Sequence, residues 1–292
     1  NMVLVKGGTF TIGDSGDGSG ENYLTNISEV QATNEIILDD FFINKYEVTW
    51  FEYEVYLKDV GLYGPDEPSS IYFGIKSDDN ESSPNYKFRP AMSESWGGAN
   101  SYCKWLALKT GENYALPTEA QWEYAARSRG KKVFHAGKPG VKLVLDNYMR
   151  GEYVVKNRET NEVKVLNASD PLAPVIGNAL GEFETNYRRI VGSYPPNELG
   201  LYDMVGNVQE WVADWYEKEY YPKMERVNPL GPREPVEWAK FRNGKSIPKK
   251  VVRDWLYGGG LIQNGEVYTR GSKPINNSQT GFRCVKNFSS ET

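Results

Sequence analysis

The sequence is poor in the residue types that most often carry metal and nucleophilic chemistry. Its 292 residues include two cysteines, Cys103 and Cys284, and a single histidine, His135. One histidine cannot supply a site that needs several imidazole ligands, and the cysteines have no paired spacing around it. Ser-His-Asp and Cys-His catalysis would both depend on His135, and no GxSxG segment is present. Hydrolase function is therefore disfavoured.

Long apolar runs and an excess of positive charge are also absent. No segment approaches the run of about 18 apolar residues that spans a bilayer, so no transmembrane segment is predicted. The chain has 39 acidic and 34 basic residues, a net charge of −5, and no basic stripe in the sequence. Generic binding to nucleic acid or to anionic membranes depends on clustered positive charge, so both are disfavoured.

Aromatic residues and glycine, by contrast, are abundant. The chain contains 20 tyrosines, 8 tryptophans and 29 glycines, a composition typical of a folded protein with many aromatic contacts and turns. Alternating apolar residues predict a strand and turn over Met2–Ile12 and a second strand over Ile36–Ile43. Thr49 is a suitable N-cap for a short helix that follows this second strand.

Two further helices have clear signals. Apolar spacing predicts a helix from Trp96 to Lys109 that stops at Gly111. Thr118 and Gln121 form a capping-box pattern that opens the next helix. Beyond Gly130 short apolar runs alternate with turn residues, which predicts an irregular, β-rich half. No repeat or flexible linker divides the chain, so residues 1–292 are predicted to form a single domain.

Four segments carry a family resemblance: NKYEVTWFEYEVYL, LPTEAQWEYAAR, GLYDMVGNVQEW and GFRCVK, which begin at Asn44, Leu116, Gly200 and Gly281. In these segments the chain resembles the formylglycine-generating enzyme family, also called the sulfatase-modifying-factor family. The resemblance implies an α+β, C-type-lectin-like fold, in which a small antiparallel sheet and two helices are embedded in much irregular chain.

The resemblance bears on the state of the cysteines. Composition alone leaves open whether Cys103 and Cys284 are free thiols or one disulfide. In the family, a cysteine in the helix before LPTEAQWEY pairs with the cysteine after GFR, and the resemblance implies the same bond here. Closing a loop of about 180 residues would stabilise the fold by up to about 5 kcal/mol in the entropic description.

The catalytic cysteines of the family are missing. Its enzymes carry a reactive cysteine pair upstream of GFR that binds copper(I) and oxidises a substrate cysteine, whereas no cysteine lies between Arg253 and Gly281. A thiolate is needed for this chemistry. The sequence therefore predicts a protein that is not an enzyme and that needs no redox cofactor.

A structural calcium site is implied by the segment GLYDMVGNVQEW. By resemblance, the side chains of Asp203 and Glu210 and the backbone carbonyls of Gly206 and Val208 would coordinate the ion. Hard oxygen donors from a compact loop suit Ca²⁺. The alternative is an ordinary turn whose carboxylates face water or pair with arginine.

The C-terminal segment 253–273 is the predicted ligand-binding region. The chain resembles the variable proteins of diversity-generating retroelements, in which a segment ending near GFR is rewritten while the body of the fold stays fixed. Where members of the formylglycine-generating enzyme family have the motif RGGSW, this chain has Arg253 followed by DWLY. The predicted contact residues mix aromatic, apolar and polar types, as binding surfaces do; they are Trp255, Leu256, Tyr257, Leu261, Ile262, Gln263, Asn264, Val267, Tyr268 and Lys273, with Trp238 and Phe241 as neighbours.

These features together predict a receptor or adhesin with a macromolecular ligand, for which protein is the favoured class. Nucleic acid is not expected as a partner. We expect an extracytoplasmic location, at the cell surface or anchored to the outer membrane through a lipoprotein signal that has been removed. An enzyme of the same family with altered chemistry and a structural component of a bacterial envelope assembly are the alternatives.

Overall fold

The structure is a computed structural model. It describes residues 1–13, 33–62, 86–92, 95–131, 141–144, 153–157, 163–166, 190–192, 196–204, 207–253, 270–277 and 280–288. The helices in these ranges are α1 (Trp50–Asp59), α3 (Trp96–Thr110) and α4 (Glu119–Ala126), with the 3-10 turns η1 (Tyr86–Phe88) and η4 (Tyr221–Lys223).

The strands of the N-terminal half are β1 (Met2–Val5), β2 (Gly8–Ile12), β3 (Asn34–Leu38), β4 (Phe41–Asn44), β5 (Tyr114–Ala115), β6 (Val141–Val144), β7 (Tyr153–Asn157) and β8 (Val163–Leu166). Those of the C-terminal half are β9 (Glu210–Trp215), β10 (Trp238–Lys240), β11 (Ser246–Arg253), β12 (Arg270–Pro274), β13 (Gly281–Phe282) and β14 (Val285–Asn287). Helices and short strands therefore occur together, which is consistent with the α+β prediction.

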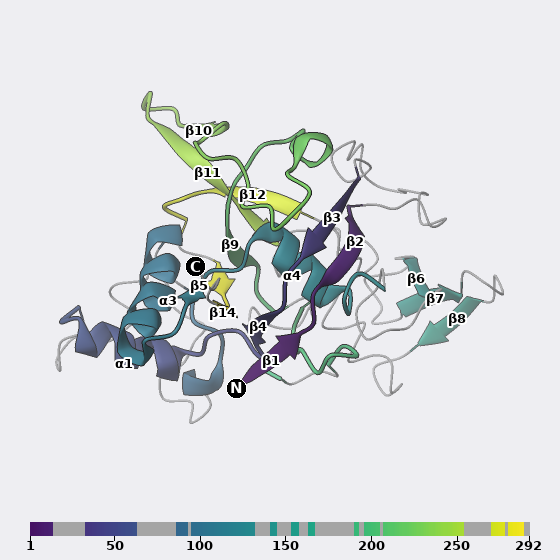
Figure 1. Ribbon diagram of the computed structural model, residues 1–292, viewed down its shortest axis with the longest axis horizontal. Helices are drawn as coiled ribbons and strands as arrows, with labels where there is room; N and C mark the ends of the chain where they lie inside the picture. Colours follow the sequence, from purple (N-terminus) through teal and green to yellow (C-terminus); the bar gives the residue numbers. More distant parts are fainter. Residues whose placement is uncertain are drawn as a thin grey trace.

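The sheets join parts of the chain that are distant in sequence. One sheet has the order β1-β4-β14-β5, so the C-terminal strand β14 lies between two strands of the N-terminal half (Figure 1). A second has the order β10-β11-β9-β13. In this sheet β10 pairs with residues 246–248 of β11, and β12 pairs with residues 249–253. Strands β2 and β3 form a two-stranded sheet, and β6, β7 and β8 form a three-stranded one.

The three helix predictions are confirmed, and the reason is local. Thr49 caps α1 and Thr118 caps α4, each in a complete capping box whose third helical residue bonds back to the cap. Helix α3 begins at Trp96 as expected and ends at Thr110, one residue beyond the predicted Lys109, with Gly111 as its C-cap. These ends are set by hydrogen bonds within four residues, so the sequence alone determines them.

One strand prediction is corrected. The stretch Ile36–Ile43 is not a single strand, because it divides into β3 and β4 at Asp39 and Asp40, and the two strands pair with different partners. The carboxylate of Asp40 accepts hydrogen bonds from the backbone of Gly7 at 2.8 Å and from Lys6 at 2.7 Å. A short polar break with these fixed contacts redirects the chain between the two sheets.

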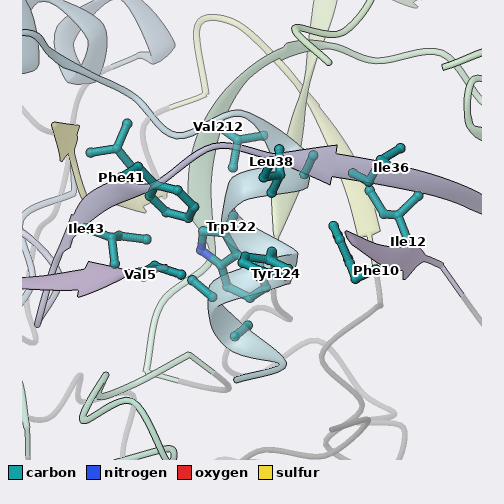
Figure 2. Close-up of a cluster of buried hydrophobic side chains, with 14 of the residues drawn as sticks. Val5, Phe10, Ile12, Ile36, Leu38, Phe41, Ile43, Trp122, Tyr124 and Val212 are labelled. Carbon is teal, nitrogen blue, oxygen red and sulfur yellow. The ribbon is translucent and has the colours of Figure 1, made fainter. Parts of the chain in front are cut away.

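A hydrophobic core surrounds α4. Its buried side chains come from β1 to β4, α4 and β9 and include two large aromatic rings of α4, as Figure 2 shows for Val5, Phe10, Ile12, Ile36, Leu38, Phe41, Ile43, Trp122, Tyr124 and Val212. A second cluster packs α1 and α3 against Trp211 and Phe282. The core thus holds α4 and β9 in fixed positions, and these elements supply the groups described below.

The disulfide implied by the resemblance is present. Cys103 of α3 is bonded to Cys284, which lies between β13 and β14, and both residues are fully buried. The bond joins positions 181 residues apart and fixes the C-terminal strands to the second core cluster. Within the described residues, no helix is both long and apolar enough to cross a membrane.

Candidate functional site

Strands β11 and β12 flank residues 254–269, which make up most of the predicted ligand-binding segment 253–273. They pair antiparallel from Lys249↔Pro274 to Arg253↔Arg270, so residues 253 and 270 lie directly opposite each other. Strands β11 and β12, which end and begin at these two residues, therefore lie side by side in the sheet (Figure 1). The predicted contact residues Trp255, Leu256, Tyr257, Leu261, Ile262, Gln263, Asn264, Val267 and Tyr268 lie outside the described residues.

The paired ends are anchored in a buried ion cluster. Arg270 binds both carboxylate oxygens of Glu119, through Nε and Nη2, each at 2.8 Å. Arg253 donates to Glu119 at 2.9 Å and to Glu123 at 2.9 Å. Tyr221 donates its hydroxyl proton to Glu119 at 3.0 Å and accepts from Arg253 at 3.0 Å. We call these five residues the anchor cluster.

The anchor cluster is buried, and its two arginines face its two carboxylates. Arg253, Glu119 and Glu123 are 0 % exposed, and Arg270 is 7 % exposed. Burial by itself raises the pKa of Glu119, but the facing guanidinium groups of Arg270 and Arg253 outweigh it and hold the pKa below its usual value. Burial and the charge of Glu119 raise the pKa of Tyr221 well above its usual range. Glu119 is thus ionised and the phenol of Tyr221 is protonated at neutral pH.

Sequence reasoning missed the acidic half of this cluster. The sequence analysis selected Arg253 as the start of the ligand-binding segment, but it placed Glu119 and Glu123 only within the helix that begins after Thr118. The available signal was their spacing of four residues, which puts both on the same helix face as the buried Trp122. A fully buried carboxylate needs a basic partner. This requirement could have suggested Arg253 and Arg270 as the partners of Glu119 and Glu123.

Beside the anchor cluster, Lys250 is held between two tryptophans. Its Nζ lies 3.7 Å from the ring centroid of Trp215 and 4.1 Å from that of Trp96, and it donates a short 2.5 Å hydrogen bond to the carbonyl of Ala213. Burial lowers the pKa of Lys250 to about 8, although the nearby carboxylate of Asp214 acts in the opposite direction. The ammonium group of Lys250 therefore makes its contacts within the fold, and these contacts help to hold the middle of β11 in place.

Lys273 is the one predicted contact residue that the structure describes. It lies on β12, half-buried, and its ammonium donates to Thr280 Oγ1 at 3.0 Å. Burial lowers the pKa of Lys273 to about 8. Its backbone pairs with Lys250, which places it at the base of the segment 254–269.

The predicted calcium loop contains more buried acid than base. Both oxygens of Glu210 accept from Arg283, at 2.6 to 3.0 Å, and one also accepts from Trp122 at 2.8 Å. Asp203 is buried, with Oδ2 bonded to the backbone of Gly192 at 2.6 Å. Glu47, which sequence reasoning did not select, lies in the same cluster and accepts from Asn207.

These contacts decide which groups suit a cation. The oxygens of Glu210 are already committed, so Glu210 does not fit the ligand role as its side chain is placed. The spare acceptors are Asp203 Oδ1 and Glu47 Oε1, which are buried and have no hydrogen-bond partner among the residues that the structure describes. Burial raises the pKa of Asp203 to about 6 and the pKa of Glu47 well above its usual value. Val208 is buried beside them, Gly206 lies outside the described residues, and calcium binding here stays a prediction.

Chemistry that needs a thiol has no group available, because the sequence contains two cysteines and both belong to the disulfide. In the part of the chain that the structure describes, no three His, Cys, Asp or Glu side chains are arranged to hold a metal ion. His135 lies outside that part. What the described residues do show is a firmly bonded pair, Arg253 and Arg270, on either side of the segment 254–269.

A family model matches nearly the whole chain. Residues 1–288 match the sulfatase-modifying factor enzyme 1-like domain. The chain is 29% identical over 298 residues to the serine/threonine-protein kinase pkn1 of Chlamydia pneumoniae, covering 98% of this chain and 38% of that protein. It is 25% identical over 271 residues to the formylglycine-generating enzyme of Bos taurus, covering 79% of this chain and 62% of that enzyme. The chain thus spans well under half of the first relative and under two thirds of the second.

Two solved structures share the fold. PvdO from Pseudomonas aeruginosa matches with a TM-score of 0.62 at 23% identity, over 98% of this chain and 94% of the other. The Treponema denticola variable protein 1 matches with a TM-score of 0.59 at 18% identity, over the same shares of the two chains. Identities this low show a common fold alone.

Proposed function

We propose that this chain, which belongs to the sulfatase-modifying factor enzyme 1-like domain family, is a ligand-binding member of the family and not an enzyme. The family scaffold, which we take to be a C-type-lectin-like fold in a single domain over residues 1–292, would present the segment 254–269 together with Lys273 to a macromolecular ligand. Protein is the favoured class of ligand.

The observation that carries this proposal is the way the segment 254–269 is attached. The residues that flank it, Arg253 and Arg270, are paired in the sheet, and both are hydrogen-bonded to the fully buried Glu119. A segment closed at a rigid base loses less freedom when it binds, and it can change in sequence without disturbing the core. Aromatic residues within it, such as Trp255 and Tyr257, offer large contact areas.

Two further observations agree with the proposal. The only cysteines are bonded to each other, which removes the thiolate that the family's oxidation chemistry requires. The fold is shared with a protein described as a variable protein of Treponema denticola. A structural disulfide persists in oxidising surroundings, which favours an extracytoplasmic location.

Two substitutions test whether the segment 254–269 is a binding element or part of the core. Trp255→Ala with Tyr257→Ala should leave the melting temperature within about 2 °C of the parent, as surface changes do. Arg253→Ala, the matched control at the anchored end, should lower it strongly. Equal losses in the two variants would show that Trp255 and Tyr257 are packed in the core and would contradict the proposal.

Variation in the segment is tested by sequencing the coding locus in many sibling isolates from one ancestor. Substitutions confined to positions between Arg253 and Lys273, with Arg253 and Arg270 unchanged, are expected for a diversified binding protein. A displayed library randomised at the predicted contact positions and selected against lysozyme should also yield folded binders. An invariant segment, together with a library that contains no folded members, would contradict the proposal that this segment is a diversified binding element.

The competing function is an enzyme with altered chemistry, which the relationship to formylglycine-generating enzymes favours. It is tested with cysteine-containing peptides in the presence of copper(I). Product formation that survives replacement of Cys103 and Cys284 by alanine would support an enzyme that uses another group. If no product forms, and the displayed library yields folded variants that bind, the ligand-binding function is supported.

A further inference from the structure

A hairpin on the outer part of the second sheet has a composition unlike the rest of the chain. Strands β10 and β11 pair through Trp238↔Pro248 and Lys240↔Ser246 and project from the body of the molecule (Figure 1). The stretch from Trp238 to Arg253 holds six basic residues and no acidic one, whereas the whole chain has 39 acidic and 34 basic residues. The net charge of −5 therefore conceals a local cationic element, and the expectation that the sequence holds no basic stripe is wrong for this hairpin.

The six basic residues divide by position along the hairpin. Arg253 and Lys250 are buried, and Lys249, at 3.8 Å from Glu237, is half-buried. The three nearest the tip, Lys240, Arg242 and Lys245, are exposed, and none of them forms a salt bridge with another described residue. The inner cations hold the fold together, while the outer cations face solvent.

Two large aromatic residues stand among the outer cations. Trp238 is 47 % exposed and shares the face of β10 with Lys240, and Phe241, at the start of the turn, is 43 % exposed. Aromatic rings this exposed at a projecting tip have little core to cover. Trp and Phe next to Lys and Arg are the residue types that settle at the boundary between headgroups and acyl chains.

The tip is ordered without help from a partner. The backbone N–H of Phe241 donates to the carbonyl of Lys245 at 2.9 Å, and that of Gly244 donates to the carbonyl of Phe241 at 3.0 Å. The N–H of Lys245 donates to the side-chain oxygen of Asn243 at 3.1 Å. The aromatic and cationic side chains are thus presented in a fixed arrangement, which reduces the entropy lost on binding.

We propose that the β10–β11 hairpin is a docking element for an anionic lipid surface, with Trp238 and Phe241 entering the interface and Lys240, Arg242 and Lys245 contacting the headgroups. The projection of the tip favours lipid over a protein partner, because a narrow hairpin reaches a membrane without requiring a large complementary face. This inference does not depend on the segment 254–269.

The test is co-sedimentation of the full chain with vesicles of phosphatidylcholine alone and of phosphatidylcholine mixed with phosphatidylglycerol. We expect binding to the mixed vesicles only, and weaker binding at high salt, because exposed charges are screened. The triple variant Lys240→Gln, Arg242→Gln, Lys245→Gln should bind about tenfold more weakly or worse. The matched control, Lys87→Gln, Lys104→Gln, Lys131→Gln, removes the same charge from exposed lysines elsewhere and should bind as the parent does.

The aromatic contribution is tested with Trp238→Ala and Phe241→Ala together, which should also weaken vesicle binding. Quenching of tryptophan fluorescence by brominated lipid should be smaller in Trp238→Phe than in the parent. Equal loss in both charge triples, or no binding to mixed vesicles, would overturn the proposal. So would binding to poly-glutamate that needs the three cations but not the aromatic pair, because it would indicate an acidic polypeptide partner. Trp255→Ala with Tyr257→Ala should leave vesicle binding unchanged, which separates this test from that of the proposed function.

Discussion

Strand β11 and the turn that precedes it carry the same kind of side chain in opposite environments. At its C-terminal end, Arg253 is fully buried and bonded to Glu119 and Glu123. At its N-terminal end, the turn leading into Ser246 exposes Arg242 and Lys245 to solvent. The strand therefore joins a closed electrostatic anchor to an open cationic tip.

The difference shows how burial divides the roles of charged residues. A buried arginine must be paired, because an isolated charge in a dry interior is very costly, so its contacts are committed to the fold. An exposed arginine contributes little to stability and remains available to a partner. Function is therefore expected at the tip and beside the anchor, and the anchor cluster itself should respond mainly in stability.

The largest effect is expected at the anchor. Glu119→Ala would leave Arg253 and Arg270 without their shared carboxylate and should lower the free energy of unfolding by about 3 to 5 kcal/mol. Urea denaturation followed by tryptophan fluorescence measures this loss. Glu119→Gln, which keeps the shape but loses the charge, should lie between the parent and the alanine variant. A loss below about 1 kcal/mol for Glu119→Ala would mean that the cluster does not anchor the sheet.

A second test uses the predicted calcium loop, where buried carboxylates exceed cations. The pKa of Asp203 is raised to about 6 from 3.8, so the folded state favours the protonated form. Its stabilising contribution is fully present below about pH 4 and is lost as pH rises through about 6, by at most about 3 kcal/mol. Asp203→Asn keeps a side chain that tolerates the positive φ of 54° and should flatten this part of the pH–stability profile.

Calcium sharpens the same measurement. Denaturation of the parent and of Asp203→Asn is compared at pH 7 with added calcium and with a chelator. Stabilisation of the parent alone would place the ion at Asp203, since a ligand that binds the folded state raises its stability. Identical profiles for the two proteins at every pH would mean that Asp203 carries no shifted ionisation.

A further comparison, of two glycines in loops next to the second sheet, separates backbone strain from packing. Gly231 and Gly244 both have φ of +80°, but a Cβ at Gly231 would lie 2.7 Å from the side chain of Asp214, whereas a Cβ at Gly244 would meet nothing within 4 Å. Gly244→Ala should therefore cost about 1 to 2 kcal/mol from strain alone. Gly231→Ala should cost about 1 to 3 kcal/mol more, measured by thermal unfolding. Equal costs would show that the neighbour of Gly231 moves aside freely.

The smallest effect is expected at the tip. Arg242→Ala should change the free energy of unfolding by no more than about 0.5 kcal/mol, because its guanidinium is exposed. The measurement is the same urea titration used for Glu119→Ala. A large loss here would mean that the tip is part of the folding core, and the contrast between the ends of β11 would disappear.

The sequence was sufficient for features that depend on neighbouring residues. The N-cap at Thr49 and the capping-box pattern at Thr118 predicted the starts of α1 and α4, because the hydrogen bonds involved span three residues. The absence of free thiols follows directly from the cysteine count once Cys103 and Cys284 are bonded. The pairing of these cysteines came from family resemblance and not from any local pattern.

Features that join distant residues could not be read in this way. The division of Ile36–Ile43 into β3 and β4 depends on which sheet each strand joins. The commitment of Glu210 to Arg283 joins residues 73 apart, and the predicted loop contained no sign of that arginine. Most of the predicted ligand-binding residues lie outside the described part of the chain, so their role stays a prediction.

By itself the sequence determined the helix ends, the family and the lack of a reactive cysteine pair, because each is written in short segments or in composition. Only the tertiary structure decided that Arg253 and Arg270 share Glu119, and that the charges of one strand are dry at one end and solvated at the other. The physical reason is that the energy of a charge depends on its burial and its partners, and both are set by residues far away in the chain.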